Sequence, residues 1–275
     1  MRTFKFKVDK FSTQKEKLIT VLSLATKLES DKLKDAIIKG AVWLQVKGQG
    51  KIERIYSPEA LVFPNDLLTL NYDSKILSLP TLENAECLYE TQHYGVWFKE
   101  AGTMPQGTQA GDHTSLLRLI ENNKKKVIYL IHRIDRETAG PMIFGYSKEG
   151  AQKLSDLFQK NQIRKTYEAV VLGLIPVGTK QTIDQSIDGK RAITHFECVG
   201  SQGNHSLLKV DIETGRLHQI RRHLEYIGYP VMGDPKYGKN NKNRAGLQLL
   251  AKSLHFNDPW TKKPIDVVVN QCLKL

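Results

Sequence analysis

The residues best suited to chemistry lie in the stretch HRIDRETAG, residues 132–140. There the carboxylate of Asp135 lies between Arg133 and Arg136, in a stretch that follows an apolar run. A carboxylate in a protected cleft can act as a nucleophile or as a general base. Either role requires the ionised form, which burial disfavours and a neighbouring cation favours. An arginine from elsewhere in the chain should therefore reach Asp135.

The stretch RLHQIRRHLEYIG, residues 216–228, supplies that arginine. Arg221 falls at the edge of the apolar stripe of this predicted helix, where its stem can pack while its head group turns into a cleft. Arg222 falls nearly opposite, in solvent. The alternative is that Arg221 is a rim residue in a weak surface pair. At about 100° per residue, four apolar side chains share the stripe: Leu217, Ile220, Leu224 and Ile227.

Two core strands should flank the Asp135 loop, a place where catalytic groups are often found. The runs KVIYLI (126–131) and PMIFGYS (141–147) have the β-branched and aromatic content of buried strands. A helix over 147–161 and strands within 165–175 and 206–215 follow. Isolated strands alternating with few helices are compatible with an α+β fold.

The chain divides into two parts. Helix-like, lysine-rich sequence runs to about residue 73, and strand-rich sequence begins at about residue 86. We predict a small domain over residues 1–78 and a catalytic domain over residues 79–275. The first should hold two short helices, a hairpin and a last strand that follows a Pro-Asn-Asp turn. Its lysines could contact phosphates or form an ordinary solvated surface.

The amino-acid composition limits the class of binding partner. The 275 residues include 41 Lys+Arg against 29 Asp+Glu, a formal net charge of +12, which favours a polyanion, with nucleic acid ahead of an anionic membrane. No apolar run approaches the roughly 18 residues that would span a bilayer, so we expect no membrane association and a cytoplasmic location. Three scattered cysteines predict neither a disulfide framework nor a zinc site: Cys87, Cys198 and Cys272.

No metal site is expected. His218 and His223 lie about 140° apart on a helix, and no acidic third ligand is in register. A metal-dependent nuclease would also need a carboxylate cluster that the sequence lacks. The polar, basic segment GKNNKNRAG, residues 238–246, is equally compatible with an RNA contact and with a solvated loop.

Three motifs, read together, resemble a known family. HRIDRETAG, RKTYEAVVLG and ETGRLHQIRRHLEYIG are similar to the motifs H-R-L-D-x-x-T-S-G, K-x-Y-x-A-x-V-x-G and T-G-R-x-H-Q-I-R-x-H-L of the RluA-type pseudouridine synthases. They occur in the right order, and with GDPKYG the resemblance covers most of residues 90–260. Two positions depart from the pattern: Ala139 replaces the usual Ser, and Glu100 stands in place of the Lys-Pro pair.

The resemblance implies an α+β catalytic domain with a mixed, mostly antiparallel β-sheet and a central RNA-binding cleft. It also implies a small N-terminal α/β RNA-binding domain. The implied activity is an isomerase that converts uridine to pseudouridine in RNA without a cofactor. Large-subunit ribosomal RNA is the first expected substrate, and transfer RNA is the alternative. A non-catalytic RNA-binding assembly factor is the competing class. We expect a monomer.

The resemblance also assigns site residues. Asp135 is the implied catalytic carboxylate, Arg221 its cation, and Tyr167 the tyrosine expected to stack on the uracil; the alternative is that Tyr167 fills a core edge. His132 is expected to position its loop, as a hydrogen-bonded structural histidine, or to contact RNA. The remaining expected RNA contacts are Arg133, Arg136, Lys165, Arg216, His218 and Lys99.

Overall fold

The computed structural model describes residues 1–239, 241 and 244–275. By its internal contacts the chain divides into two compact units. The first comprises residues 1–83 and 106–123, and the second comprises residues 84–105 and 124–275. The division into functional domains at residues 78 and 79 stays a prediction.

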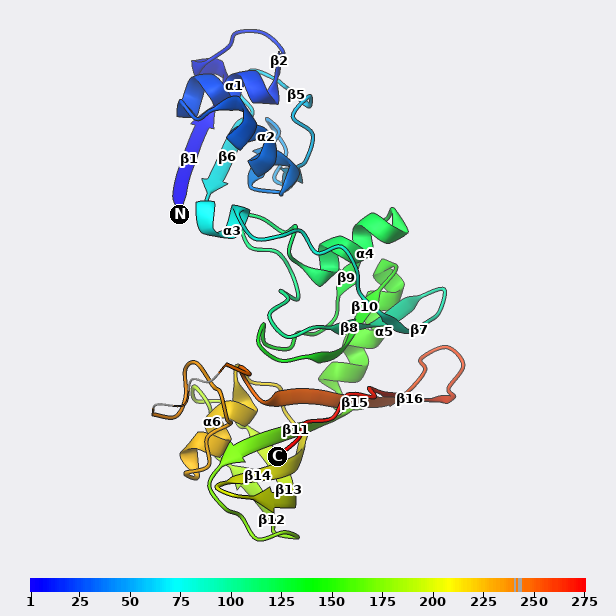
Figure 1. The fold of residues 1–275 in the computed structure, drawn as a ribbon. Helices are drawn as coiled ribbons and strands as arrows, with labels where there is room; N and C mark the ends of the chain where they lie inside the picture. Colours follow the sequence, from blue (N-terminus) through cyan, green and yellow to red (C-terminus); the bar gives the residue numbers. More distant parts are fainter. Residues whose placement is uncertain (240, 242–243) are drawn as a thin grey trace. The chain divides into compact units, whose positions relative to one another are not determined.

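The first unit is built on a four-stranded sheet of order β1-β6-β3-β4, of which Figure 1 labels β1 and β6. Its predicted hairpin is present, because β3 and β4 pair antiparallel from Val42↔Ile55 to Gln45↔Ile52. A small second sheet pairs β2 with β5. The elements are β1 (Arg2–Lys7), η1 (Val8–Lys10), β2 (Glu16–Lys17), α1 (Leu18–Thr26), α2 (Ser30–Ile38), β3 (Val42–Gln45), β4 (Ile52–Ile55), β5 (Leu61–Val62), β6 (Leu67–Tyr72), α3 (Ser74–Leu77) and α4 (Leu116–Lys124).

The helices α1 and α2 cover one face of this sheet and close its core. The apolar positions of both helices recur at helical spacing, so one face of each can be buried. The fully buried side chains include Leu18 and Leu22 of α1, Leu33 of α2, and Leu68 and Leu70 of β6. This core explains how the first segment folds as a unit.

Residues 106–123 belong to the first unit, although the sequence predicted them in the second part of the chain. The amide of Asp112 donates to the carbonyl of Lys39 over 3.0 Å. The indole Nε1–H of Trp43 donates to the carbonyl of Gln109 over 2.9 Å. Long-range hydrogen bonds to main-chain carbonyls leave no pattern in the sequence, which is why the inclusion of residues 106–123 in the first unit could not be predicted.

The second unit contains a four-stranded sheet of order β7-β8-β10-β9. Its two central strands, β8 and β10, are buried at every residue, as predicted for the strand after the Asp135 loop. The predicted strand over 126–131 is wrong in its extent, because β9 spans only two residues and Val127 is 64% exposed. The strands are β7 (Cys87–Glu90), β8 (Tyr94–Lys99), β9 (Tyr129–Leu130) and β10 (Gly140–Gly145).

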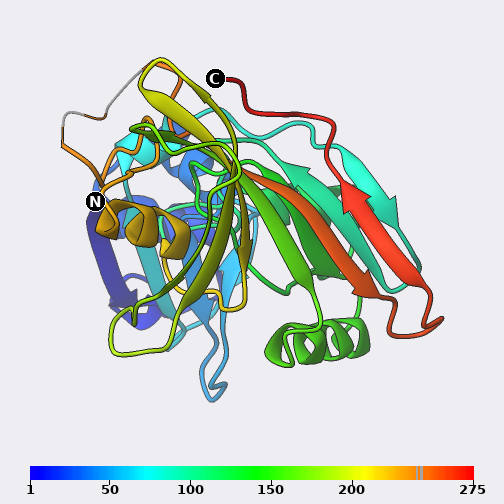
Figure 2. The same cartoon turned by 90° about the horizontal axis from the view of Figure 1, so that it is seen from below.

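A six-stranded antiparallel sheet, of order β12-β13-β14-β11-β15-β16, forms the other half of this unit. Figure 2 shows its strands side by side, from yellow-green β12 to red β16. An isolated parallel bridge joins Ala139 to Leu250 of β15. The strands are β11 (Arg164–Leu172), β12 (Lys180–Asp184), β13 (Ile193–Gln202), β14 (His205–Ile212), β15 (Leu249–Asn257) and β16 (Pro264–Val268).

Two helices complete the unit. Helix α5 (Lys148–Gln159) buries Leu154 in a core that contains Ile143 of β10 and Phe256 of β15, so one cluster ties both sheets together. Helix α6 (Gln219–Tyr226) is shorter than predicted. Its predicted stripe is wrong at Leu217, which lies before the helix and is 62% exposed, because His218 adopts a left-handed backbone with φ 53°.

Candidate active site

The loop that carries Asp135 connects β9 to β10 and is bonded to its surroundings. Inside it, the amide of Thr138 donates to the carbonyl of Asp135 over 3.1 Å. At its end, the carbonyl of Ala139 accepts from the amide of Ala251 on β15 over 2.8 Å. Gly140 has φ +138°, and a Cβ there would lie 2.4 Å from the carbonyl oxygen of Ala251. The close approach of two backbones therefore requires glycine at this position.

Asp135 is paired with Arg221, as the sequence predicts. The Nη1 of Arg221 donates to Oδ2 of Asp135 over 2.9 Å, and the arginine side chain is 2% exposed. The alternative of a rim arginine in a surface pair is thus wrong. Burial alone would lower the pKa of Arg221, but hydrogen bonds to Asp234 and Asp135 outweigh it and raise that pKa. The guanidinium is therefore a permanent cation beside Asp135.

Asp234 is a second acidic partner of Arg221, and its role was not predicted from the sequence. Its two oxygens accept from Nε and Nη2 of Arg221 over 2.7 and 2.8 Å. Burial would raise the pKa of Asp234, yet the bonds from Arg221 and from the amides of Lys236 and Tyr237 hold it below its usual value. The available signal was the motif GDPKYG, where an acidic residue opens a turn next to a predicted helix.

Tyr167 lies on β11 with its side chain in the cleft that Asp135 lines. The pairing of β11 with β15 shifts register between Thr166 and Tyr167. Thr166 donates through its hydroxyl to Asp211 over 2.8 Å. Burial, and then the negative charge of Asp135, raise the pKa of Tyr167, so its hydroxyl keeps its proton at neutral pH.

His218 lies next to Asp135 and just outside α6. Its Nε2 is 3.9 Å from Oδ2 of Asp135, and its Nδ1 is 3.0 Å from the hydroxyl of Tyr237. Burial lowers its pKa, so the ring is neutral at pH 7. A non-glycine residue with positive φ is uncommon and is found at functional sites, where the surroundings hold it in place.

His132 anchors the start of the loop. Its Nε2 accepts the amide N–H of Ile143 over 3.0 Å, and its ring stacks on Phe158 with centroids 4.5 Å apart. Burial, and then the charge of Lys165, lower its pKa to about 3. These contacts fit the expected structural histidine, because an imidazole nitrogen that accepts an amide proton cannot also be protonated.

Lys99 does not fit its predicted contact with RNA. Its side chain is 0% exposed, and its ammonium donates to three carbonyls, of Glu100, Thr103 and Arg136, over 3.0, 2.9 and 3.0 Å. All three protons are therefore used inside the protein. Burial lowers the pKa of Lys99 from 10.5 to about 8. The residue joins the loop after β8 to the Asp135 loop.

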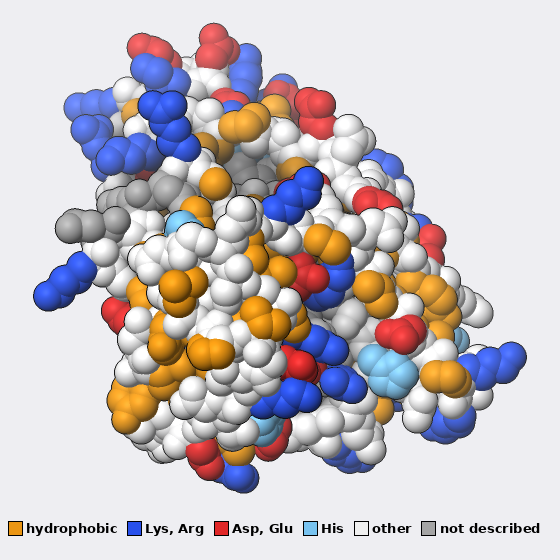
Figure 3. All heavy atoms as spheres, turned by 60° about the horizontal axis from the view of Figure 1, so that its bottom comes forward, with side chains coloured by type: hydrophobic (Ala, Val, Ile, Leu, Met, Phe, Trp, Pro, Cys, Tyr) orange, Lys and Arg blue, Asp and Glu red, His pale blue; other side chains and the backbone are white. Residues whose placement is uncertain are grey.

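The other predicted RNA contacts surround the cleft, which has a volume of about 680 Å³. Arg136 pairs with its neighbour Glu137 over 3.1 Å, and Nε of Arg216 donates to the carbonyl of Arg191 over 3.0 Å. Lys165 has its ammonium 5.8 Å from the ring centroid of Phe158. The cleft-lining residues with basic or imidazole side chains are His132, Arg133, Arg136, Lys165, Arg216 and His218. In Figure 3 basic and acidic side chains meet around a hollow of the face shown.

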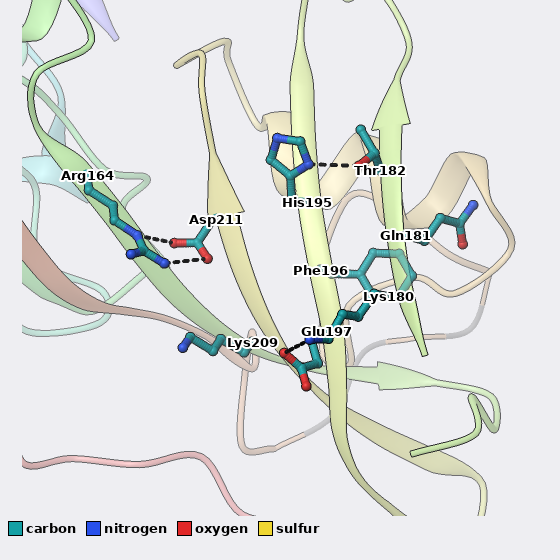
Figure 4. Close-up of a pocket in the computed structure, with 9 residues that line it drawn as sticks. All are labelled: Arg164, Lys180, Gln181, Thr182, His195, Phe196, Glu197, Lys209 and Asp211. Atoms are coloured by element: carbon teal, nitrogen blue, oxygen red, sulfur yellow. Dashed lines mark hydrogen bonds and ion pairs between the residues drawn. The ribbon is translucent and has the colours of Figure 1, made fainter. Parts of the chain in front are cut away.

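A second groove, of about 390 Å³, lies over β11, β12, β13 and β14 (Figure 4). Its charges are largely paired with one another. Arg164 donates to Asp211 over 3.3 and 3.4 Å, and Lys180 lies 3.5 Å from Glu197. The groove lacks the combination of a carboxylate with one buried arginine and a nearby tyrosine. The Asp135 cleft is therefore the stronger candidate for catalysis.

The described residues hold neither a metal-binding cluster nor a membrane-spanning helix. In residues 1–239, 241 and 244–275, no group of three or more His, Cys, Asp or Glu side chains is arranged to hold a metal ion. Within the same described part of the chain, every helix is too short or too polar to cross a membrane. Residues 240, 242 and 243 of the basic segment 238–246 lie outside the described residues.

Residues 93–226 match the RNA pseudouridylate synthase family. The chain is 38% identical over 140 residues to an uncharacterized RNA pseudouridine synthase of Chloroflexus aurantiacus, covering 46% of this chain and 43% of that protein. It is 31% identical over 172 residues to tRNA pseudouridine synthase C of Haemophilus ducreyi, covering 51% of this chain and 71% of the relative. It is 32% identical to ribosomal large subunit pseudouridine synthase D of Pseudomonas aeruginosa, over 56% of this chain and 53% of the relative.

The chain belongs to the RNA pseudouridine synthase family, as its motifs predicted. It spans about half the length of the Chloroflexus and Pseudomonas relatives. Its fold is similar to that of human RNA pseudouridylate synthase domain containing 1, with a TM-score of 0.60 at 20% identity over 70% of this chain and 86% of that chain. Human RNA pseudouridylate synthase domain containing 4 gives a TM-score of 0.55 at 23% identity over 67% and 87%.

Proposed function

We propose that this protein isomerises specific uridines to pseudouridine in structured RNA. The observation that carries the proposal is the Asp135 carboxylate, which is 21% exposed, hydrogen-bonded to a buried arginine and located in a cleft with Tyr167. A cleft of about 680 Å³ lies in the range of pockets that bind small molecules, so it can admit one nucleoside.

The reaction accounts for these residues. The N1–C1′ bond of uridine breaks, the uracil turns in place, and C5 bonds to C1′; N1 gains a proton and C5 loses one. No electron and no water is exchanged with the surroundings, so a cofactor is not required. Asp135 acts either as the nucleophile or as the base that removes the 2′ proton to give a glycal-like intermediate. In both routes Arg221 holds the carboxylate in the cleft through the hydrogen bond from its Nη1 to Oδ2.

The nucleotide must leave its helix to expose C1′ and N1. Tyr167 is then the stacking partner of the uracil, an interaction worth about 1–3 kcal/mol per base. Arg133 fills the space that the base leaves or holds the backbone, and Lys165 and Arg216 contact phosphates at the rim.

Relatives named for ribosomal and for transfer RNA both occur, and large-subunit ribosomal RNA is our first choice of substrate. A monomer in the cytoplasm and RNA binding by the small domain are part of the proposal.

The test compares the wild type with Asp135→Asn and Asp135→Ala on transcribed ribosomal and transfer RNAs, with chemical mapping of pseudouridine. We expect product from the wild type and a loss of more than about 1,000-fold in both variants, since the reacting group is removed. Asp211→Asn, which changes a carboxylate of the second groove, is the matched control and should keep activity. Tight binding by the wild type without product on any RNA would instead support the RNA-binding assembly factor.

A further inference from the structure

The guanidinium of Arg221 serves two carboxylates unequally. Its Nε and Nη2 both donate to Asp234, over 2.7 and 2.8 Å. Only Nη1 donates to Asp135, over 2.9 Å and to Oδ2 alone. The planar fork of arginine matches a carboxylate best when two N–H groups face its two oxygens. Asp234, and not Asp135, occupies that two-donor edge.

Asp234 is itself fixed. Its side chain is 0% exposed. Besides the arginine, Oδ1 of Asp234 accepts the amides of Lys236 and Tyr237 over 2.8 and 3.0 Å. The preceding residue, Gly233, donates its amide to Oδ1 of Asn241 over 2.9 Å. A carboxylate with this many fixed donors cannot turn, so the arginine bound to it is held in one orientation.

As a consequence, Arg221 donates a hydrogen bond to only one of the two carboxylate oxygens of Asp135. Oδ2 takes one hydrogen bond from Arg221, and His218 lies 3.9 Å from the same oxygen. No described residue donates a hydrogen bond to Oδ1, and the side chain lines the cleft. The formal charges of the three groups sum to one negative charge, so one arginine does not neutralise both carboxylates.

We propose that Asp234 is a positioning residue, which holds the two-donor edge of Arg221 away from Asp135 and so leaves Oδ1 of Asp135 free to react with the nucleotide. Without Asp234, the arginine can turn that edge to Asp135 and hydrogen-bond both of its oxygens. The pair would be stronger and the carboxylate less reactive. The expected effect of Asp234 on turnover rests on the proposed function. The geometric half of the inference, that Asp234 fixes the orientation of Arg221, does not depend on it.

The geometric half is tested without RNA, by NMR of the Arg221 Nε–H signal, which Arg221→Lys identifies by its loss. In the wild type this buried, hydrogen-bonded proton should exchange slowly with water. We expect Asp135→Asn to leave the signal and its exchange rate in place, because the Nε partner is Asp234. A signal that shifts or exchanges fast in Asp135→Asn would overturn the proposal. Asp135 is partly exposed, so this variant has little reason to misfold.

The catalytic half is tested by single-turnover kinetics with Asp234→Asn. We expect the rate constant to fall about 100-fold, the effect of misplacing a catalytic group by about 1 Å, while RNA affinity stays unchanged. Asp188→Asn is the matched control. Asp188 accepts two bonds from Arg222, the next residue of α6, over 2.9 and 3.0 Å, but it is 67% exposed. That variant should turn over at the wild-type rate.

The outcomes separate the two proposals. Absence of product from the wild type refutes the proposed function, and the NMR result still decides the orientation of Arg221. A wild-type rate in Asp234→Asn, or a loss of RNA affinity equal to the loss of rate, overturns the role of Asp234. If Asp234→Asn does not fold, the Asp135→Asn spectrum decides whether Asp234 holds the arginine.

Discussion

The cations around the Asp135 cleft form two groups that differ in what their head groups contact. In the interior, Arg221 bonds two carboxylates and Lys99 bonds three carbonyls, and neither is more than 2% exposed. At the rim, Arg133 and Arg216 are exposed, and Lys165 lines the cleft over Phe158. The interior cations hold protein segments in place, whereas the rim cations have N–H groups available to a ligand.

The contrast is sharpest between adjacent residues of α6. Arg221 points into the core, and Arg222 reaches Asp188 with its side chain 31% exposed. Both make hydrogen-bonded ion pairs of similar length. Desolvation is what differs: removing one member of a buried pair leaves a charge that water cannot reach, and removing one member of an exposed pair does not. The hydrogen-bond distances alone do not separate the two pairs.

The largest effect is expected for Arg221→Ala. It leaves Asp234 buried without its cation, so the free energy of unfolding should fall by about 3–5 kcal/mol. Pseudouridine formation should be abolished, because Asp135 loses its partner as well. Urea denaturation and product mapping measure the two effects. If Arg221→Ala and Arg222→Ala lower stability equally, the distinction between interior and rim is wrong.

Lys99→Met tests the second interior cation through pH. Burial lowers the pKa of Lys99 from 10.5 to about 8, so between these values the unfolded chain binds a proton that the folded chain does not. The wild-type free energy of unfolding should therefore rise by about 3 kcal/mol as the pH increases from 8 to 10.5, relative to Lys99→Met.

Paired urea titrations across that window measure the difference. The two curves should diverge below pH 10, before the tyrosines of the unfolded chain lose their protons. Parallel curves would mean that Lys99 keeps its ordinary affinity for protons. It would then be accessible to water and available to RNA, as first predicted.

The sequence predicted the pairing of Asp135 with Arg221 but not the residues that hold this pair in place. Their pairing was predicted because Asp135 and Arg221 each lie in a recognisable motif, and because the helical period places Arg221 at the edge of the apolar stripe. Asp234 was missed, since pairing between residues 13 apart across a turn has no periodic signature. Lys99 was predicted to contact RNA, but its ammonium donates to carbonyls of the protein. The sequence around a lysine before a glycine-containing loop does not distinguish these two roles.

The fold shows the same limit. The helices of the first unit and the strand after the Asp135 loop follow from local apolar patterns. β1 was missed, although Phe4 and Phe6 alternate with lysines, because a short lysine-rich segment also reads as a solvated terminus. The excursion of residues 106–123 into the first unit depends on long-range backbone bonds, which a single sequence does not encode as a pattern.

Lys165→Met should change RNA binding and not stability. Burial lowers the pKa of Lys165, and no acidic partner accounts for its position beside Tyr167 in the described part of the cleft. If its ammonium contacts a phosphate, the slope of log affinity against log salt should become smaller by about 1. Lys209→Met, an exposed lysine of the second groove, is the control and should leave the slope unchanged. Equal slopes for Lys165→Met and the wild type would remove Lys165 from the RNA-binding residues.

The smallest effect is expected for Arg222→Ala. Its partner Asp188 is 67% exposed, so neither charge is desolvated and the pair adds little that water does not supply. The midpoint of urea unfolding and the single-turnover rate should both match the wild type, and only RNA affinity at low salt should weaken. Arg221→Lys provides the contrast on the same helix, since it keeps the charge but loses the fork that spans Asp234 and Asp135. A larger loss of turnover in Arg222→Ala than in Arg221→Lys would mean that the outer arginine serves the reaction, and that burial is a poor guide to which cation acts on Asp135.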